Sequence, residues 1–590
     1  MDVDAEAPTW ELDSLCPGGP DGPAFDERRH AAAARISALD RATDGLGPLS
    51  EAADAWAGAV LAYEQIDGDL TELGSFATCA ASVDSGSGAA RAAEAHTDDL
   101  RRHLREVRCR LDAAIDAASD AAFDGWVSRD DLAPARPWVE RVRSGRRLRL
   151  APALQALKVS LDREAVTGWG RLYDQLAGDL VGELRGEQKG VAELAALRAT
   201  PDPELRRDAF RAGTAAWSSI GTVCAHALTH LTGARQQHHD RLGVDELAET
   251  LFDNRLARSS LDAMWAAADA ARPALVRYLG RKAELLGKDA LDWWDLDAPV
   301  GGASVALPFD GAVERIAHAF DGMYPELGQF AREVATARWV DARAGAGRRG
   351  GGFCTSFPRS RQSRIFMTYT GTLDNATTLA HELGHAWHNR VLEREPVLRT
   401  DLTSALAETA STFGEAVFRD RQLSLASDPS FRQFMLDQQL QAAVAFLMDI
   451  PHRFRFERRL YELRRQGLLE PDQLSAEVVA IQRASYGGAL ASWNPTFWCS
   501  KLHFYIPEFG FYNWPYTFGY LFSGLVHARA KAEGPASIGW VKELLLRTGW
   551  QDTDALASEV LGLDLSDPAT WVEAVRPIEA LVDAFVDGSA

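Results

Sequence analysis

The sequence predicts a mostly all-α fold with one small β-sheet, and three features of the chain support this prediction. From about Asp26 to Ala290, apolar residues recur at three- and four-residue spacing among Ala, Leu, Arg and Glu, which is typical of successive amphipathic helices. The helical pattern resumes after Asp374 and continues nearly to the end of the chain. Between the two helical regions, the β-branched and aromatic residues 363–370 form the best strand candidate.

Glycine and proline divide these regions into shorter elements. Helix breaks are predicted at residues 82–88, 132–137 and 200–203, where turn-forming residues interrupt the apolar periodicity. Residues 345–352 contain five glycines and are predicted to be a loop. An aromatic segment at residues 493–522 interrupts the second helical region. A chain of 590 residues is long enough to form several lobes with a large buried core.

The overall composition excludes several classes of protein. Hydrophobic residues make up 46% and charged residues 25% of the chain, as in ordinary globular proteins. Asp and Glu outnumber Lys and Arg by 84 to 63, and the net charge of −21 disfavours binding to nucleic acid. The six cysteines form no CxxC pair. The acidic start of the chain and the lack of about 18 successive apolar residues predict a cytoplasmic protein without a membrane partner.

An HExxH sequence is the strongest chemical signal in the chain. It consists of His381, Glu382, two apolar or small residues and His385. On a helix, residues four apart lie on one face, so the two imidazoles can bind one zinc ion. Thr372 or Asp374 can cap the start of this helix. Glu382 then lies beside the metal without binding it, where it can take a proton from water as a catalytic base.

A catalytic zinc ion needs a third protein ligand. The extended HExxHxxGxxH pattern is excluded, because His388 and Val391 stand at its Gly and His positions. The small-residue segment that follows contains two acids on one helical stripe, Glu408 and Glu415. We therefore expect Glu408 to be the third ligand and Glu415 to accept a hydrogen bond from a ligand imidazole. His388 is expected to pack beside the ligands, with a fourth-ligand role as the alternative.

These segments resemble a known family. HELGHAWH, followed by AETASTFGE, is similar to the oligoendopeptidase F branch of the thimet-oligopeptidase family of zinc peptidases. The similarity extends to residues 365–371, which resemble the family's edge strand before the zinc helix, and to residues 503–520. The resemblance implies a helical, two-lobed body with a deep substrate channel and a small β-sheet beside the zinc helix. It also implies an N-terminal helical region at 1–200 and a zinc peptidase region at 201–590.

The family places a histidine and tyrosines opposite the zinc ion. By resemblance, His503, Tyr512 and Tyr516 are the catalytic candidates in this chain, with Tyr520 as the alternate. An imidazole or phenol can donate a hydrogen bond to the oxyanion that forms when water attacks a peptide carbonyl. The chain departs from the family pattern by an insertion at residues 506–510.

The sequence therefore predicts a zinc-dependent oligoendopeptidase that carries one catalytic Zn²⁺ ion and cuts internal bonds of short, unstructured peptides. A helical zinc carboxypeptidase is the first alternative, because it would share the HExxH sequence and the distal glutamate. The second is a catalytically silent, zinc-containing peptide-binding protein, against which the intact Glu382 argues. Neither the preferred cleavage site nor the oligomeric state follows from the sequence.

Overall fold

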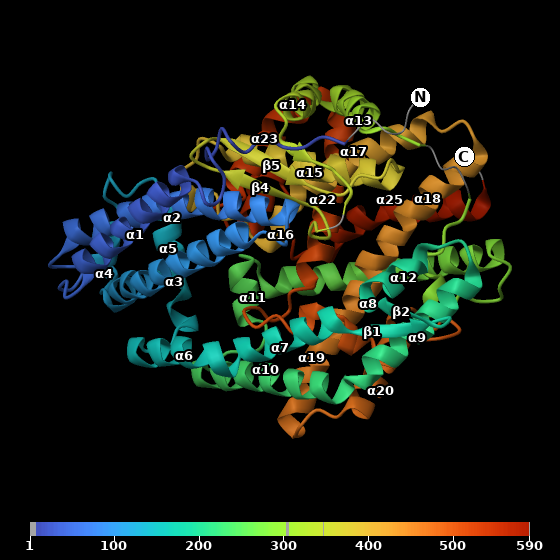
Figure 1. Cartoon of the computed structure of the whole chain (residues 1–590), viewed down its shortest axis with the longest axis horizontal. Helices are drawn as coiled ribbons and strands as arrows, with labels where there is room; N and C mark the ends of the chain where they lie inside the picture. The colour runs from blue at the N-terminus through green and yellow to red at the C-terminus, as the bar shows by residue number, and fades with distance from the viewer. Residues whose placement is uncertain (1–6, 302–305, 346, 589–590) are drawn as a thin grey trace. The chain divides into compact units, whose positions relative to one another are not determined.

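The computed structural model describes residues 7–301, 306–345 and 347–588, and the chain folds into two compact units (Figure 1). Unit 1 consists of Met1–Arg147, Ser304–Gln422 and Val526–Val560. Unit 2 consists of Leu148–Ala303, Leu423–Leu525 and Leu561–Ala590. Both units are built mainly of helices, which confirms the predicted fold class. The predicted boundary at residue 200 stays a prediction.

Unit 1 combines an N-terminal helical bundle, a small sheet and the helices around the HExxH sequence. Its helices are α1 (Pro23–Thr43), α2 (Ala53–Val83), α3 (Gly88–Ala117), α4 (Asp120–Val127), α5 (Arg136–Ser144), α13 (Phe309–Met323), α14 (Pro325–Thr336), α15 (Leu373–Leu392), α16 (Ser404–Ala407), α17 (Thr409–Leu425), α23 (Ile538–Arg547) and α24 (Thr553–Leu556). The division between the units falls near the end of α17. The break between α2 and α3 lies where the sequence predicts it.

A three-stranded sheet connects the bundle of unit 1 to the helix that carries the HExxH sequence. Its strands are β3 (Val340–Asp341), β4 (Phe353–Phe357) and β5 (Gln362–Phe366), in the order β3-β5-β4. The pair β4–β5 is antiparallel and the pair β3–β5 is parallel. The predicted strand at residues 363–370 is therefore shorter in the structure. It is also central, whereas the resemblance implied an edge strand.

The two faces of this sheet contact different helices. Phe353 and Phe366 are paired across β4 and β5 and pack into the apolar core of the N-terminal bundle, which includes α2. On the opposite face, the side-chain amide of Asn389 in α15 donates to Ser363 Oγ at 3.1 Å. Because side chains alternate along a strand, one short sheet can hold α15 against the N-terminal bundle. The sheet thus lies between the N-terminal bundle and α15.

Unit 2 is a second helical body with its own core. Its elements are α6 (Pro152–Ala165), α7 (Thr167–Asp179), β1 (Val181–Leu184), β2 (Glu187–Gly190), α8 (Val191–Ala196), α9 (Pro203–Ser219), α10 (Gly221–Leu242), α11 (Ala248–Asp253), α12 (Arg258–Leu285), α18 (Pro429–Val444), α19 (Ile450–Gln466), α20 (Pro471–Ser485), α21 (Phe497–Ser500), α25 (Pro568–Asp587) and the first part of α22 (Trp514–Glu533). A π-helical turn at Ala445–Asp449 joins α18 to α19.

A buried ion pair connects two long helices of unit 2. Lys282 of α12 and Asp437 of α18 lie 3.1 Å apart, and both side chains are fully buried. Tyr278 donates a hydrogen bond of 2.6 Å to the same carboxylate. Removal of one partner would leave an uncompensated buried charge, so the pair specifies how α12 and α18 pack.

The β1–β2 hairpin of unit 2 is not predicted by the sequence. Its four register pairs contain several charged or amide side chains and no β-branched residue other than Val181. Arg185 and Gly186 form the turn with positive φ angles of 52° and 88°. Gly182 faces α9, where an added Cβ would lie 2.8 Å from the Ala212 carbonyl oxygen. Contact with α9 therefore supports a strand that the local sequence only weakly favours.

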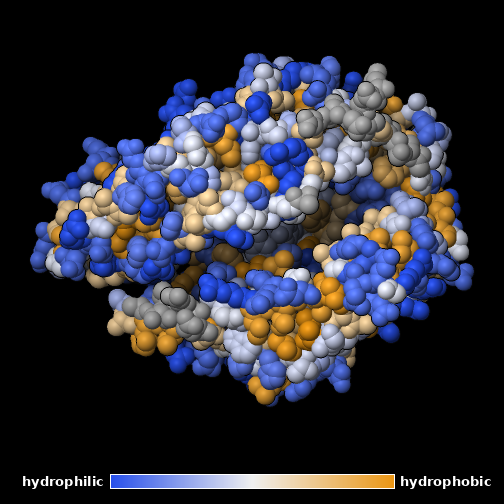
Figure 2. Space-filling view, viewed as in Figure 1, coloured by the Kyte–Doolittle hydropathy of each residue, from blue (hydrophilic) through white to orange (hydrophobic). Residues whose placement is uncertain are grey.

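None of the helices in the described part of the chain is both long enough and apolar enough to cross a bilayer. On the face shown in Figure 2, much of the surface is hydrophilic, and apolar side chains gather in several patches.

Candidate metal centre

Helix α15 presents three polar side chains of the HExxH sequence. Thr372 caps the helix by accepting a hydrogen bond from the Asn375 amide at 3.1 Å. No proline interrupts Leu373–Leu392, so His381 and His385 lie one turn apart on the same face. Their rings are 4.8 Å apart, centroid to centroid, and nearly perpendicular.

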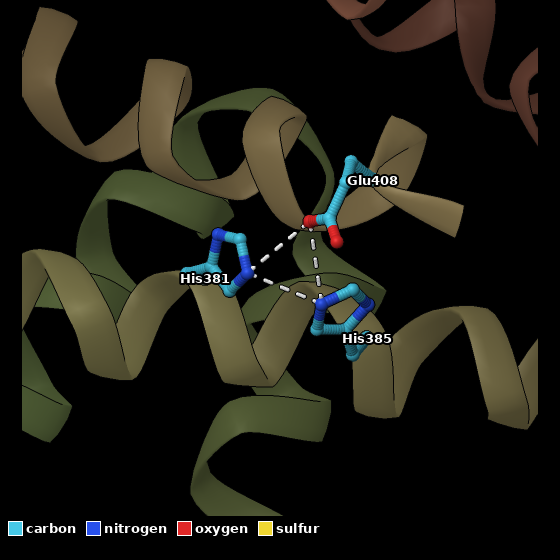
Figure 3. Close-up of side chains that lie close together, drawn as sticks. All are labelled: His381, His385 and Glu408. Atoms are coloured by element: carbon cyan, nitrogen blue, oxygen red, sulfur yellow. Dashed lines mark hydrogen bonds and ion pairs between the residues drawn. The ribbon is translucent and has the colours of Figure 1, made fainter. Parts of the chain in front are cut away.

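Glu408 lies at a one-residue break between α16 and α17. The sequence predicts one continuous helix here, but Glu408 is the C-cap of α16 with ψ near 1°. Ser411 donates its hydroxyl to Glu408 Oε2 at 2.8 Å and so fixes the carboxylate. The break and the serine together orient Glu408 toward α15 (Figure 3).

Helices α15 and α17 approach each other closely through two glycines. A Cβ at Gly384 would lie 2.4 Å from the Ala410 carbonyl oxygen, and one at Gly414 would lie 2.8 Å from the Ala380 carbonyl oxygen. The contact is therefore backbone against backbone on both sides. Small residues on the second helix favour such an approach, and Gly384, inside the HExxH sequence itself, is a contact that the sequence pattern did not predict.

His381, His385 and Glu408 converge on one point (Figure 3). Nε2 of His381 lies 3.1 Å from Nε2 of His385 and 3.3 Å from Glu408 Oε2, and Nε2 of His385 lies 3.5 Å from the same oxygen. Zinc bonds of 2.0–2.2 Å in a tetrahedral site would separate ligand atoms by about 3.3–3.6 Å. These three side chains thus fit one metal ion, and they are the group within the described residues that could hold one.

Glu415 fixes the orientation of one imidazole. Its Oε1 accepts a hydrogen bond from Nδ1 of His381 at 2.6 Å, and its Oε2 forms a 2.7 Å ion pair with Arg419. With its Nδ1 proton directed at a carboxylate, His381 can offer the lone pair of Nε2 to a cation. Burial alone would lower the pKa of His381, but Glu415 and the nearby carboxylates outweigh it and raise that pKa to about 9. Burial lowers the pKa of His385 to about 4.

Glu382 is buried beside this group. It is 5% exposed, and its Oε2 has no hydrogen-bond partner in the part of the chain that the structure describes. A Cβ at Gly352 would lie 3.4 Å from Oε1, so the glycine-rich loop passes close to the carboxylate. Burial raises the pKa of Glu382 to about 7, although His381 opposes the shift. Such a carboxylate can exchange a proton near neutral pH.

His388 contacts a different helix. Its Nε2 lies 3.1 Å from the Leu545 carbonyl oxygen in α23 and 2.8 Å from Thr548 Oγ1. The side chain is 1% exposed, and burial lowers its pKa to about 4. His388 is not among the three residues that converge on the possible metal position, so its observed contacts attach α15 to α23.

The predicted oxyanion donors gather into an aromatic cluster within unit 2. His503 stacks on Tyr512 at 5.4 Å and contacts Tyr516 at 5.9 Å, while Tyr512 and Tyr516 meet edge to face at 5.8 Å. The alternate candidate, Tyr520, instead stacks on Phe446 at 4.6 Å. The cluster belongs to unit 2, whereas His381, His385 and Glu408 belong to unit 1. Their joint action stays a prediction.

Comparison with known proteins agrees with the resemblance seen in the sequence. Residues 318–576 match the model of peptidase family M3. The chain is 24% identical to the chromosomal oligoendopeptidase F of Lactococcus lactis subsp. cremoris over 254 residues, which is 42% of this chain and 41% of that protein. It is 22% identical to oligopeptidase PepF of Bacillus subtilis over 392 residues, which is 65% of this chain and 56% of that protein. The chain thus matches about half the length of these curated relatives.

Solved structures are similar over almost the whole chain. Oligoendopeptidase F from Enterococcus faecium superimposes with a TM-score of 0.71 at 18% identity and covers 96% of this chain and 98% of its own. A structure of PZ peptidase A with an inhibitor gives a TM-score of 0.73 at 16% identity, with 95% and 98% covered. At these identities the similarity establishes the fold.

Proposed function

We propose that the protein is a zinc-dependent oligoendopeptidase that hydrolyses internal bonds of short, unstructured peptides. The match of residues 318–576 to the model of peptidase family M3 supports this proposal. The observation that supports it most is the convergence of His381, His385 and Glu408 directly beside the buried carboxylate of Glu382. The curated relatives described above are oligopeptidases, which favours the same substrate class. Two imidazoles and one carboxylate leave a tetrahedral zinc ion one open position, as catalysis requires.

In the proposed mechanism, Glu382 moves the proton. A bound zinc ion would supply Lewis-acid polarisation of water and of the peptide carbonyl. Glu382 accepts a proton from the attacking water at its unbonded Oε2 and later passes it to the leaving amine nitrogen, as the carbon–nitrogen bond breaks. Glu415 keeps the Nδ1 proton of His381 directed away from the metal-binding group. His503, Tyr512 and Tyr516 are the proposed donors to the developing oxyanion.

Products from peptides blocked at both ends test this proposal. We expect mass spectrometry to find internal cleavage that stops with a chelator and returns with added zinc. Cleavage that requires a free C-terminus would instead identify the carboxypeptidase, and zinc-loaded protein that binds peptides but cuts none would identify the silent peptide-binding protein. A Glu408→Ala variant, with two ligands left, should lose zinc by elemental analysis.

Substrate size is a separate part of the proposal. The resemblance to oligopeptidases implies a narrow channel, so an unstructured peptide should be cut while the same sequence within a stably folded protein survives. Equal cleavage of the two would contradict a size limit without contradicting peptide hydrolysis.

A further inference from the structure

Arg453 of α19 is held in one orientation beside the aromatic cluster of unit 2. Its side chain is 12% exposed and forms an ion pair with Asp449, four residues earlier. Burial would raise the pKa of Asp449, but Arg453, His452 and Lys501 outweigh it and lower that pKa to about 2. The carboxylate is therefore ionised at neutral pH and anchors the Nη2 end of the guanidinium.

The other end of the guanidinium reaches the predicted catalytic histidine. Nη1 of Arg453 donates to Nδ1 of His503 at 3.4 Å and to Oδ1 of Asn513 at 3.3 Å. A guanidinium has only donors and stays protonated at all relevant pH values. Nδ1 of His503 must therefore be the acceptor, and in a neutral imidazole the single proton then lies on Nε2.

The surroundings of His503 favour the neutral ring. Burial and the two cations Arg453 and Lys501 lower its pKa to about 4, against the opposing effect of Asp449. The rings of Tyr512 and Tyr516 flank the imidazole. The histidine is partly exposed, so a neutral ring with its proton on Nε2 can meet a ligand.

We propose that Arg453 is a positioning residue that fixes His503 as the Nε2–H tautomer, so that the imidazole offers a hydrogen-bond donor to the substrate. The statement about the substrate rests on the proposed function, whereas the tautomer itself does not. The same contact gives the partly buried cation a role beside His503, because a donor directed at Nδ1 keeps that nitrogen unprotonated. The interaction links α19 to the segment around His503, which is 50 residues away in sequence.

The tautomer can be measured directly in the full-length, zinc-loaded protein. Long-range ¹H–¹⁵N correlation spectra of protein labelled at histidine distinguish the protonated from the unprotonated ring nitrogen, and loss of one set of signals in His503→Gln assigns that ring among the 14 histidines. We expect a neutral ring protonated at Nε2 near pH 7. A ring protonated at Nδ1 or at both nitrogens would overturn the proposal, and this measurement needs no Arg453 variant to fold.

Two variants then test the role of Arg453. Arg453→Met removes the donor and is expected to let the Nδ1–H tautomer appear, and to lower kcat/KM about 10–100-fold, mainly through kcat. Arg455→Met removes another arginine of α19, which bonds Ser485 and Asp269 instead, and should leave the tautomer unchanged. An unchanged tautomer in Arg453→Met would contradict the proposal.

The two hypotheses fail in different ways. If the wild-type protein hydrolyses no peptide, the proposed function is wrong, while the tautomer measurement still decides the role of Arg453. If peptides are cut and His503 carries its proton on Nδ1, the proposed function stands and the inference about Arg453 is wrong.

Discussion

At the scale of single residues, two glutamates near the same imidazole have opposite properties. Burial by itself would raise the pKa of Glu415, but Arg419 and His381 outweigh it and lower that pKa. Within the described residues Glu382 Oε2 has no hydrogen-bond partner, and burial raises the pKa of Glu382 to about 7. Their surroundings thus give the two carboxyls different properties. Glu415 is an anion that orients His381, whereas Glu382 can exchange a proton near neutral pH.

Glu382→Gln tests this assignment. The amide has nearly the same shape but cannot accept a proton, so we expect peptide turnover to fall about 10²–10⁴-fold while zinc content stays unchanged. Steady-state kinetics and elemental analysis on the same preparation measure both. Glu393→Gln, at the end of the same helix, is the control and should be near wild type. Turnover close to wild type in Glu382→Gln would exclude the residue as the base.

A buried carboxyl in unit 2 should make stability depend on pH. Glu457 of α19 accepts a hydrogen bond from the Phe511 amide at 2.7 Å, yet burial raises its pKa to about 7 from 4.5. Between pH 4.5 and about pH 7, Glu457 is deprotonated in the unfolded chain and protonated in the folded chain. The contribution of Glu457 to stability is therefore complete below about pH 4.5 and is lost as pH rises toward 7.

Glu457→Gln should remove this dependence, because the amide stays neutral and can still accept from Phe511. We expect the thermal unfolding midpoint of the variant to exceed that of wild type at pH 8 and to match it near pH 4.5. The exposed Glu462→Gln on the same helix serves as the control. If the unfolding midpoints of variant and wild type differ by the same amount at both pH values, the pKa of Glu457 is not raised.

At the scale of elements, the convergence of His381, His385 and Glu408 depends on how closely α15 and α17 cross. The ligands on α15 can share an ion with Glu408 only if the helix that follows Glu408 lies against α15. Gly384 and Gly414 permit this approach, since an added Cβ would meet backbone atoms that have no room to move.

Gly384→Ala should therefore separate the helices. The new methyl would lie 2.4 Å from a carbonyl oxygen, so we expect a loss of about 1–3 kcal/mol in the free energy of unfolding and weaker zinc binding. Gly322→Ala in α13, with no atom within 4 Å of its Cβ, is the matched control and should gain about 0.5–1 kcal/mol. Denaturant unfolding and zinc titration measure the two effects. Full zinc affinity in Gly384→Ala would show that the close crossing is not required.

At the scale of the whole molecule, the proposed metal site belongs entirely to unit 1 and the aromatic cluster to unit 2. Each unit is assembled from three separate stretches of chain, so the two groups cannot be assigned to an N-terminal and a C-terminal half. We therefore expect a bound metal ion to stabilise the elements of unit 1 and not those of unit 2, whatever their order in the sequence.

Metal removal tests this expectation. A ligand that binds only the folded state stabilises the elements that hold it, so chelation should speed hydrogen exchange in α15 and α17 and leave α12 and α18 of unit 2 unchanged. Exchange measured by mass spectrometry, with zinc added back, checks the result. In Glu408→Ala, added zinc should protect α15 much less. If chelation speeds hydrogen exchange equally in both units, this expectation is wrong.

Local patterns predicted much of this architecture. Apolar periodicity predicts the helices and several of their breaks, because an amphipathic helix needs only a repeat within one segment. The β1–β2 hairpin escaped prediction because its residues only weakly favour a strand and contact with α9 supports it. The strands β3 and β4 escaped prediction because each has few residues and pairs with β5. The predicted strand at 363–370 was longer than β5, and the edge position implied by the resemblance was wrong because β5 lies at the centre of the sheet.

By itself, the sequence determined the helical class and the four-residue spacing that puts His381 and His385 on one face of α15. It also indicated Glu408, because a third ligand must follow on a second helix. Only the tertiary structure decided that Glu415 bonds His381, that His388 turns to α23, and that Arg453 contacts His503. Spacing within a helix follows from local geometry, whereas these contacts join segments 34, 160 and 50 residues apart and depend on how the helices pack.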